Sequence, residues 1–69
     1  MSVLESHVSG VVIEAGKTAI AIKASNSNTI HTFSNLDEVF SGLNQVVRMG
    51  QAIGLYEGKF DYKTTRYRG

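Results

Sequence analysis

The chain has 69 residues, a length that allows one small domain and excludes a second. Seven Lys and Arg against six Asp and Glu give a net charge of +1, which excludes a general attraction to nucleic acid or anionic lipid. A hydrophobic content of 42% excludes a disordered chain. The absence of Cys excludes a disulfide framework and a thiolate metal site.

The N-terminal ten residues contain neither a basic start nor an apolar run of signal-peptide length, so we expect no secretory signal. The longest apolar stretches, residues 11–13 and 19–22, are far shorter than the roughly 20 residues that a transmembrane helix needs. We therefore expect a cytoplasmic protein that makes no membrane contact.

Three segments in the first half of the chain alternate with the two-residue period of β-strands. They are residues 10–15, 18–23 and 29–33. Short segments rich in Gly, Ser and Asn separate them and predict turns. On the third segment, Ile30 should face one side of a sheet, and His31 and Phe33 the other. The pattern predicts an antiparallel meander of three strands.

One later stretch has the apolar spacing of a helix. Leu36, Val39, Phe40 and Leu43 stand at positions i, i+3, i+4 and i+7, and Asn35 precedes them as a candidate N-cap. A helix here has at most two turns, too few to be stable alone. A short helix and a structured loop are both compatible with this pattern.

The rest of the chain again reads as short strands, over residues 45–49, 51–57 and 60–67. Six or seven short, mostly antiparallel strands with at most one short helix predict an all-β fold of the barrel-sandwich type. We expect a single β domain over residues 1–69, with residues 59–69 as a basic and aromatic C-terminal strand or tail.

Three glycines mark the middle of the chain, Gly42, Gly50 and Gly54, and Gln51 follows the second of them. With the valines between them, they resemble the spaced-glycine motif in the β-domain of lysostaphin-type (LytM-like) zinc endopeptidases. This chain has one additional residue between the glycines. A similar spaced-glycine motif occurs in biotinyl and lipoyl carrier domains. The resemblance covers about two thirds of the chain. It implies a barrel-sandwich hybrid fold in which the three glycines serve as structural turn residues.

The catalytic residues of the peptidase family are missing from this chain. Asn35 stands where the family's Tyr-Ala-His-Leu motif places a histidine, and no His follows Gly54. His7 and His31 are the only imidazoles, and they lie 24 positions apart, which favours ordinary surface or half-buried side chains over zinc ligands. We therefore expect no enzyme activity, no catalytic residues, no metal and no cofactor.

The carrier families modify a lysine at the tip of a hairpin. Lys59, in Glu57-Gly58-Lys59-Phe60, is the nearest counterpart in this chain. A biotinyl- or lipoyl-like carrier modified at Lys59 is therefore one alternative function, although only ten residues follow this lysine.

The C-terminal segment differs from the rest in charge. Residues 59–69 carry four basic residues and one acidic residue, a local charge of +3, with aromatic residues between them. Such a mixture suits a protein interface, a single-stranded nucleic-acid site, or an edge strand kept soluble by its charges. The candidate partner-binding residues are Phe60, Tyr62, Lys63, Arg66, Tyr67 and Arg68.

From these observations we expect a non-catalytic module that docks on another protein, such as a small accessory or inhibitor protein of a phage or mobile element. The small core adds self-association into a homo-oligomer as a further expectation. A single-stranded nucleic-acid-binding module that uses the C-terminal segment is the alternative, with nucleic acid the less favoured partner because four positive charges are few for such a site.

Overall fold

The computed structural model describes residues 1–68, and over this range it contains eight strands and no helix, hence no helix that could cross a membrane. Gly69, the last residue of the expected tail, lies outside the described residues. The all-β prediction is confirmed. The strands are β1 (Ser2–Glu5), β2 (Gly10–Ala15), β3 (Ile20–Ala24), β4 (Thr29–Ser34), β5 (Glu38–Val39), β6 (Val46–Val47), β7 (Ala52–Tyr56) and β8 (Asp61–Arg66).

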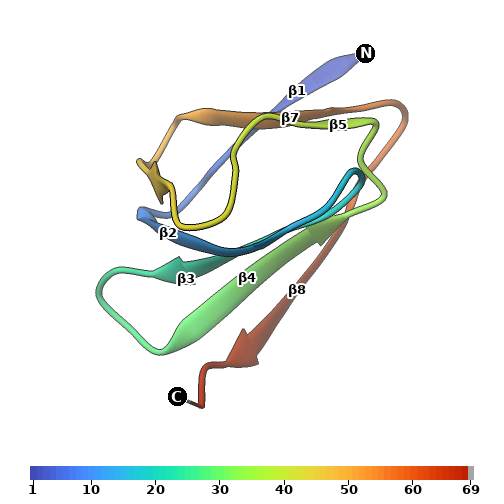
Figure 1. Cartoon of the computed structure of the whole chain (residues 1–69). Coiled ribbons are helices and arrows are strands. Elements are labelled where there is room, and N and C mark those ends of the chain that lie inside the picture. The colour runs from blue at the N-terminus through green and yellow to red at the C-terminus, as the bar shows by residue number, and fades with distance from the viewer. Residues whose placement is uncertain (69) are drawn as a thin grey trace.

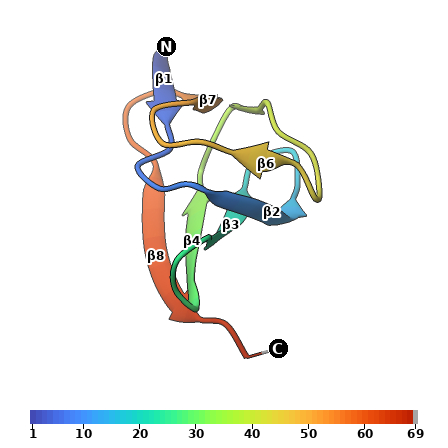
Figure 2. The ribbon, with the colours of Figure 1, turned by 90° about the vertical axis from the view of Figure 1, so that its left-hand side faces the viewer.

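The strands form two antiparallel sheets, one of three strands in the order β1-β7-β5 and one of five in the order β6-β2-β3-β4-β8 (Figure 1). In the five-stranded sheet β2, β3 and β4 are consecutive neighbours, which confirms the predicted meander. Strand β8 lies at one edge of this sheet, next to β4 (Figure 2). The two sheets do not close into one continuous barrel.

The core lies between the two sheets and draws on strands of both. Its members share an exposure of 4% or less and are Leu4, Val12, Ile20, Ile22, Phe33, Leu36, Val47 and Ile53. Strand β8 contributes none of them, and all six of its residues are exposed. On β4, strand alternation places His31 and Phe33 on the opposite side from Ile30, and Phe33 is the buried residue of this strand.

Of the two structures compatible with residues 36–43, a short helix and a structured loop, the helix does not form, and the two-residue strand β5 lies in this stretch. The sequence pattern did not predict β1 or β5, so the count of six or seven strands is wrong and the structure has eight. Leu36 is buried, whereas Phe40 and Leu43 are 46% and 60% exposed, so the four apolar residues do not share one buried face. The backbone N–H of Phe40 donates to the C=O of Ile53, beyond the two β5–β7 pairs. Asn35, the candidate N-cap, has a φ of 63°, outside the extended region that N-caps adopt.

Two turns of the same design flank β6. In one, the N–H of Gln45 donates to the C=O of Gly42, and the Gln45 side-chain oxygen accepts the Gly42 N–H at 2.7 Å. In the other, Gln51 makes the same two bonds to Arg48. The third residue of the second turn, Gly50, has the positive φ expected for it, +89°. In the first turn Asn44, and not Gly42, takes this conformation.

Gly54 was expected at a turn but lies inside β7, which corrects that expectation. A Cβ at this position would stand 2.5 Å from the backbone oxygen of Glu38 on β5. The glycine therefore allows the close approach of two strands. Gly16 is different, since a Cβ there would meet nothing closer than 3.8 Å.

We expect Gly54→Ala to lower the free energy of unfolding by about 2 kcal/mol, because β5 must move away from β7. Gly16→Ala is the matched control and should change it by less than about 1 kcal/mol, in the stabilising direction. Urea denaturation of both variants measures the difference. Equal stability of the two variants would contradict the close approach of β5 and β7.

Candidate functional site

Strand β8 is the most accessible element of the five-stranded sheet. It pairs with β4 along its whole length, from Thr29 opposite Arg66 to Ser34 opposite Asp61. Its other edge pairs with no strand among residues 1–68. An edge strand of six exposed residues is long for a sheet margin and presents unpaired backbone groups to solvent.

The direction of each backbone group of β8 follows from one hydrogen bond. The N–H of Tyr67 donates to the C=O of Asn28 at 2.6 Å, toward β4. In an antiparallel ladder every second residue bonds the same neighbour, so Thr65 and Lys63 also point their N–H and C=O groups at β4. The residues between them, Tyr62, Thr64 and Arg66, therefore direct theirs to the free edge.

The side chains of β8 divide between two faces, so the six expected partner-binding residues do not form one surface. Tyr62 lies opposite Phe33 and shares the core side of the sheet with Arg66, by the alternation of the strand. Lys63 and Tyr67 lie on the outer side, where Lys23 Nζ stands 5.2 Å from the centroid of the Tyr67 ring.

The two remaining members of the expected set lie beyond the ends of β8. Phe60 precedes the strand and is half-buried, with its ring centroid 4.8 Å from that of Tyr56 and 6.0 Å from that of Phe33. It therefore supports the core and is not freely available to a partner. Arg68 follows the strand and is exposed.

The structure brings together three side chains that the sequence did not connect. The Tyr62 hydroxyl lies 2.7 Å from Nδ1 of His31 and 3.2 Å from Nε2 of His7. The two imidazole centroids are 5.1 Å apart, with the rings nearly perpendicular. We call these three residues the His–Tyr cluster. It joins the β1–β2 connection, β4 and β8.

The protons of the His–Tyr cluster are constrained by its geometry. A phenol has one proton, so its hydroxyl can donate to only one imidazole and must accept a hydrogen bond from the other. Burial, and then the positive charge of His7, lower the pKa of His31 from its ordinary value of 6.5. The arrangement is therefore most favourable when His31 is neutral.

The connection that carries His7 is fixed on both sides. Ser6 is buried, its N–H donates to the C=O of Gln51, and its C=O accepts from Gly50. Ser9 accepts the Met49 N–H on its hydroxyl, and its C=O accepts the N–H of Ser25. His7 therefore projects from a connection that is held in place by the hydrogen bonds of Ser6 and Ser9.

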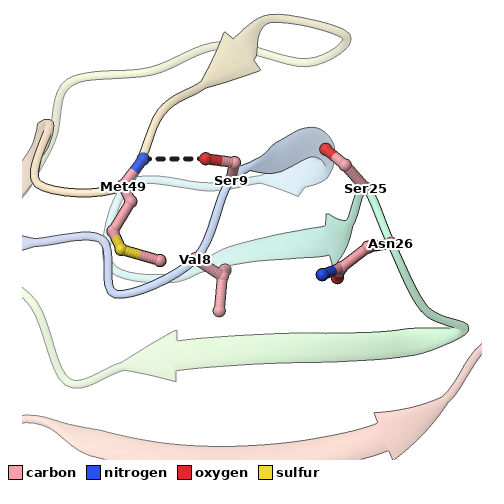
Figure 3. A pocket seen from close by; sticks show the side chains of 5 residues that line it. All are labelled: Val8, Ser9, Ser25, Asn26 and Met49. Atoms are coloured by element: carbon pink, nitrogen blue, oxygen red, sulfur yellow. Dashed lines mark hydrogen bonds between the residues drawn. The ribbon is translucent and has the colours of Figure 1, made fainter.

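An open pocket of about 240 Å³ lies beside this connection (Figure 3). It is lined by Val8, Ser9, Ser25, Asn26 and Met49. The Ser9 hydroxyl is engaged by Met49, as the dashed line in Figure 3 marks. The lining includes no charged side chain, and its polar side chains are those of Ser9, Ser25 and Asn26.

Lys59 and Asn35, the two residues to which the family resemblances draw attention, lie close together in the structure. Lys59 is exposed in the connection between β7 and β8, and Asn35 Nδ2 donates to its C=O at 3.1 Å. Among residues 1–68 there is no group of three or more His, Cys, Asp or Glu side chains that could hold a metal ion.

The two histidines lie 24 positions apart in the sequence, and no strand period or motif spacing connects them. The sequence pattern gives part of the cluster, since it places His31 and Phe33 on one face of a predicted strand and Tyr62 on a second predicted strand. The pairing of Phe33 with Tyr62 was needed to make Tyr62 a diagonal neighbour of His31. The position of His7 depends on its connection and had no sequence signal.

Comparisons with protein-family models, curated proteins and solved structures gave no match to this chain.

We expect the stability of the protein to fall at mildly acidic pH partly through His31. Because its pKa is lower in the folded state, the unfolded state binds a proton first, so the free energy of unfolding decreases as the pH falls below 6.5. Thermal unfolding at pH 7.5 and pH 5 should show a smaller decrease for His31→Gln than for the wild type. Equal decreases would argue against this proton linkage.

Proposed function

We propose that the chain is a non-catalytic protein-binding module that accepts an extended segment of a partner protein along the free edge of β8. The observation that carries this proposal is the direction of the β8 backbone. Tyr62, Thr64 and Arg66 present their N–H and C=O groups away from β4, as the register with Asn28 indicates. An added strand would satisfy them by main-chain hydrogen bonds, a common mode of peptide recognition.

The charges of β8 and its neighbourhood favour an acidic segment. Arg66 and Arg68 lie on and after the strand, and Lys63 lies on its outer face. Only Asp61, at the start of the strand, is acidic. Side chains of an added strand alternate between both faces and would meet basic groups on each. An extended segment rich in Asp and Glu is the occupant that this distribution fits best.

The alternative functions have weaker structural support. A single-stranded nucleic acid needs a shared platform for base stacking, whereas Tyr62 and Tyr67 lie on opposite faces of the sheet. Lys59, the candidate for carrier modification, follows Gly58 in an exposed connection, a position compatible with access by a modifying enzyme. Neither alternative uses the free backbone edge of β8.

We retain as a proposal the relationship to a degenerate lysostaphin-type or lipoyl-type domain of the barrel-sandwich kind. It is supported by the two-sheet arrangement and by the positive φ of Gly50 within the glycine-rich segment. The position of Gly54 inside a strand gives it no support.

A single backbone substitution tests strand addition. Thr64→Pro removes an N–H that points to the free edge and leaves the ladder with β4 intact, a position at which edge strands tolerate proline. Thr64→Ala is the matched control, because it removes the side chain and keeps the N–H. Thr65→Pro removes an N–H directed at β4 and should destabilise the fold. This result would support the assignment of which β8 backbone groups face β4 and which face the free edge.

We expect extended acidic peptides, selected from a displayed random-peptide library against the wild type, to bind Thr64→Pro about tenfold more weakly, the equivalent of about 1.4 kcal/mol. Thr64→Ala should bind within about threefold of the wild type. Fluorescence anisotropy measures the affinities. Equal binding to Thr64→Pro, or no peptide binding below 1 mM, would contradict the proposal. Salt-sensitive binding of a labelled oligo-dT at 50 mM salt would favour the nucleic-acid alternative.

A further inference from the structure

We propose that the His–Tyr cluster is a binding site for one divalent transition-metal ion of the nickel, copper and zinc group. His7 Nε2, His31 Nδ1 and the Tyr62 oxygen would be its three protein ligands, and the proton of the Tyr62 hydroxyl would be released to solvent as the ion binds. This site is separate from the free backbone edge of β8, and the proposal does not depend on strand addition.

The two distances from the Tyr62 oxygen to the imidazole nitrogens match the edges of a coordination polyhedron. Ligands about 2.05 Å from a metal stand about 2.9 Å apart in octahedral geometry and about 3.3 Å apart in tetrahedral geometry. The observed separations from the Tyr62 oxygen are 2.7 Å to His31 and 3.2 Å to His7. Both nitrogens lie within hydrogen-bonding distance of the same hydroxyl oxygen, so side-chain rotations are needed to arrange the three ligand atoms around one ion.

The site is accessible from solvent and leaves room for water ligands. His7 is exposed, Tyr62 is 45% exposed and His31 is half-buried. An ion bound here would keep one or more coordination positions for water or for a further ligand. No large movement of the chain is required for it to enter.

The ligands project from segments that are already held in place. His31 lies on β4 between β3 and β8, paired with Ile22 and Thr64. His7 lies between Ser6 and Ser9, both of which are fixed by hydrogen bonds to other parts of the chain. Binding therefore costs little ordering of the backbone, which favours affinity.

The ligand types determine which ions are suitable. Imidazole nitrogen favours nickel, copper and zinc over magnesium and calcium, which prefer clusters of carboxylate and carbonyl oxygens. Among these ions copper should bind most tightly. The imidazoles must be neutral to coordinate, so we expect binding to weaken at acidic pH.

The test uses the full chain without an affinity tag, titrated with Cu²⁺ or Zn²⁺ at pH 7.5 by isothermal calorimetry. We expect one ion per chain, with His7→Gln and His31→Gln each weakening binding at least about tenfold. Tyr62→Phe should weaken it less, since both imidazoles remain. Tyr67→Phe, on the other face of the sheet, is the matched control and should bind as the wild type does.

Two further measurements separate coordination from a purely structural effect of these residues. The electron paramagnetic resonance spectrum of the Cu²⁺ complex should show coupling to two imidazole nitrogens in the wild type and to one in each histidine variant. Zn²⁺ at 100 times its dissociation constant should raise the melting temperature by about 10–20 °C in the wild type and by much less in the double variant His7→Gln/His31→Gln.

Unchanged Cu²⁺ affinity in the double variant would overturn the proposal, because the ion would then be held elsewhere, for example at the N-terminal amine. Absence of stoichiometric binding below 1 mM in the wild type would also overturn it. Far-ultraviolet circular dichroism of each variant verifies that the fold is kept.

Discussion

The packing of Phe33 between the sheets is the interaction on which both the core and the candidate site depend. Its side chain is 1% exposed on β4, opposite Ile20 on β3 and Tyr62 on β8. Its ring centroid lies 5.2 Å from that of Tyr62 and 5.8 Å from that of His7. One aromatic ring therefore fills the core and supports two of the three members of the His–Tyr cluster. A loss of packing there would displace the site together with the core.

Elements whose side chains alternate over five or six residues could be predicted from the sequence. The meander of β2, β3 and β4 is of this kind, since alternation alone places Ile22 and Phe33 on the buried side. Residues 36–43 could not be assigned in this way, because apolar spacing does not reveal which strand completes the backbone hydrogen bonds. Here β7 provides the partner strand, and it pairs with only the two residues of β5.

The candidate site was predictable in part for the same reason. The basic and aromatic character of β8 is visible in the sequence, but its use depends on which backbone groups remain free, and only the register with β4 shows this. Tyr62 illustrates the difference. Its backbone points to the free edge, while its hydroxyl points to His7 and His31. An ion at the His–Tyr cluster would thus fix the strand and leave its edge open to a partner.

All six residues of β8 are accessible to solvent, so the residues that form the core are largely separate from those that a partner can reach. The buried core residues lie in the other strands and their connections, whereas β8 follows the edge of β4 and contacts the core through Tyr62, which is 45% exposed and packs against Phe33. Substitutions at Lys63, Thr64 or Thr65 that keep β-propensity should therefore cost the core little. Recognition at this edge can diverge rapidly during evolution, or be redesigned, while the scaffold that presents it stays the same.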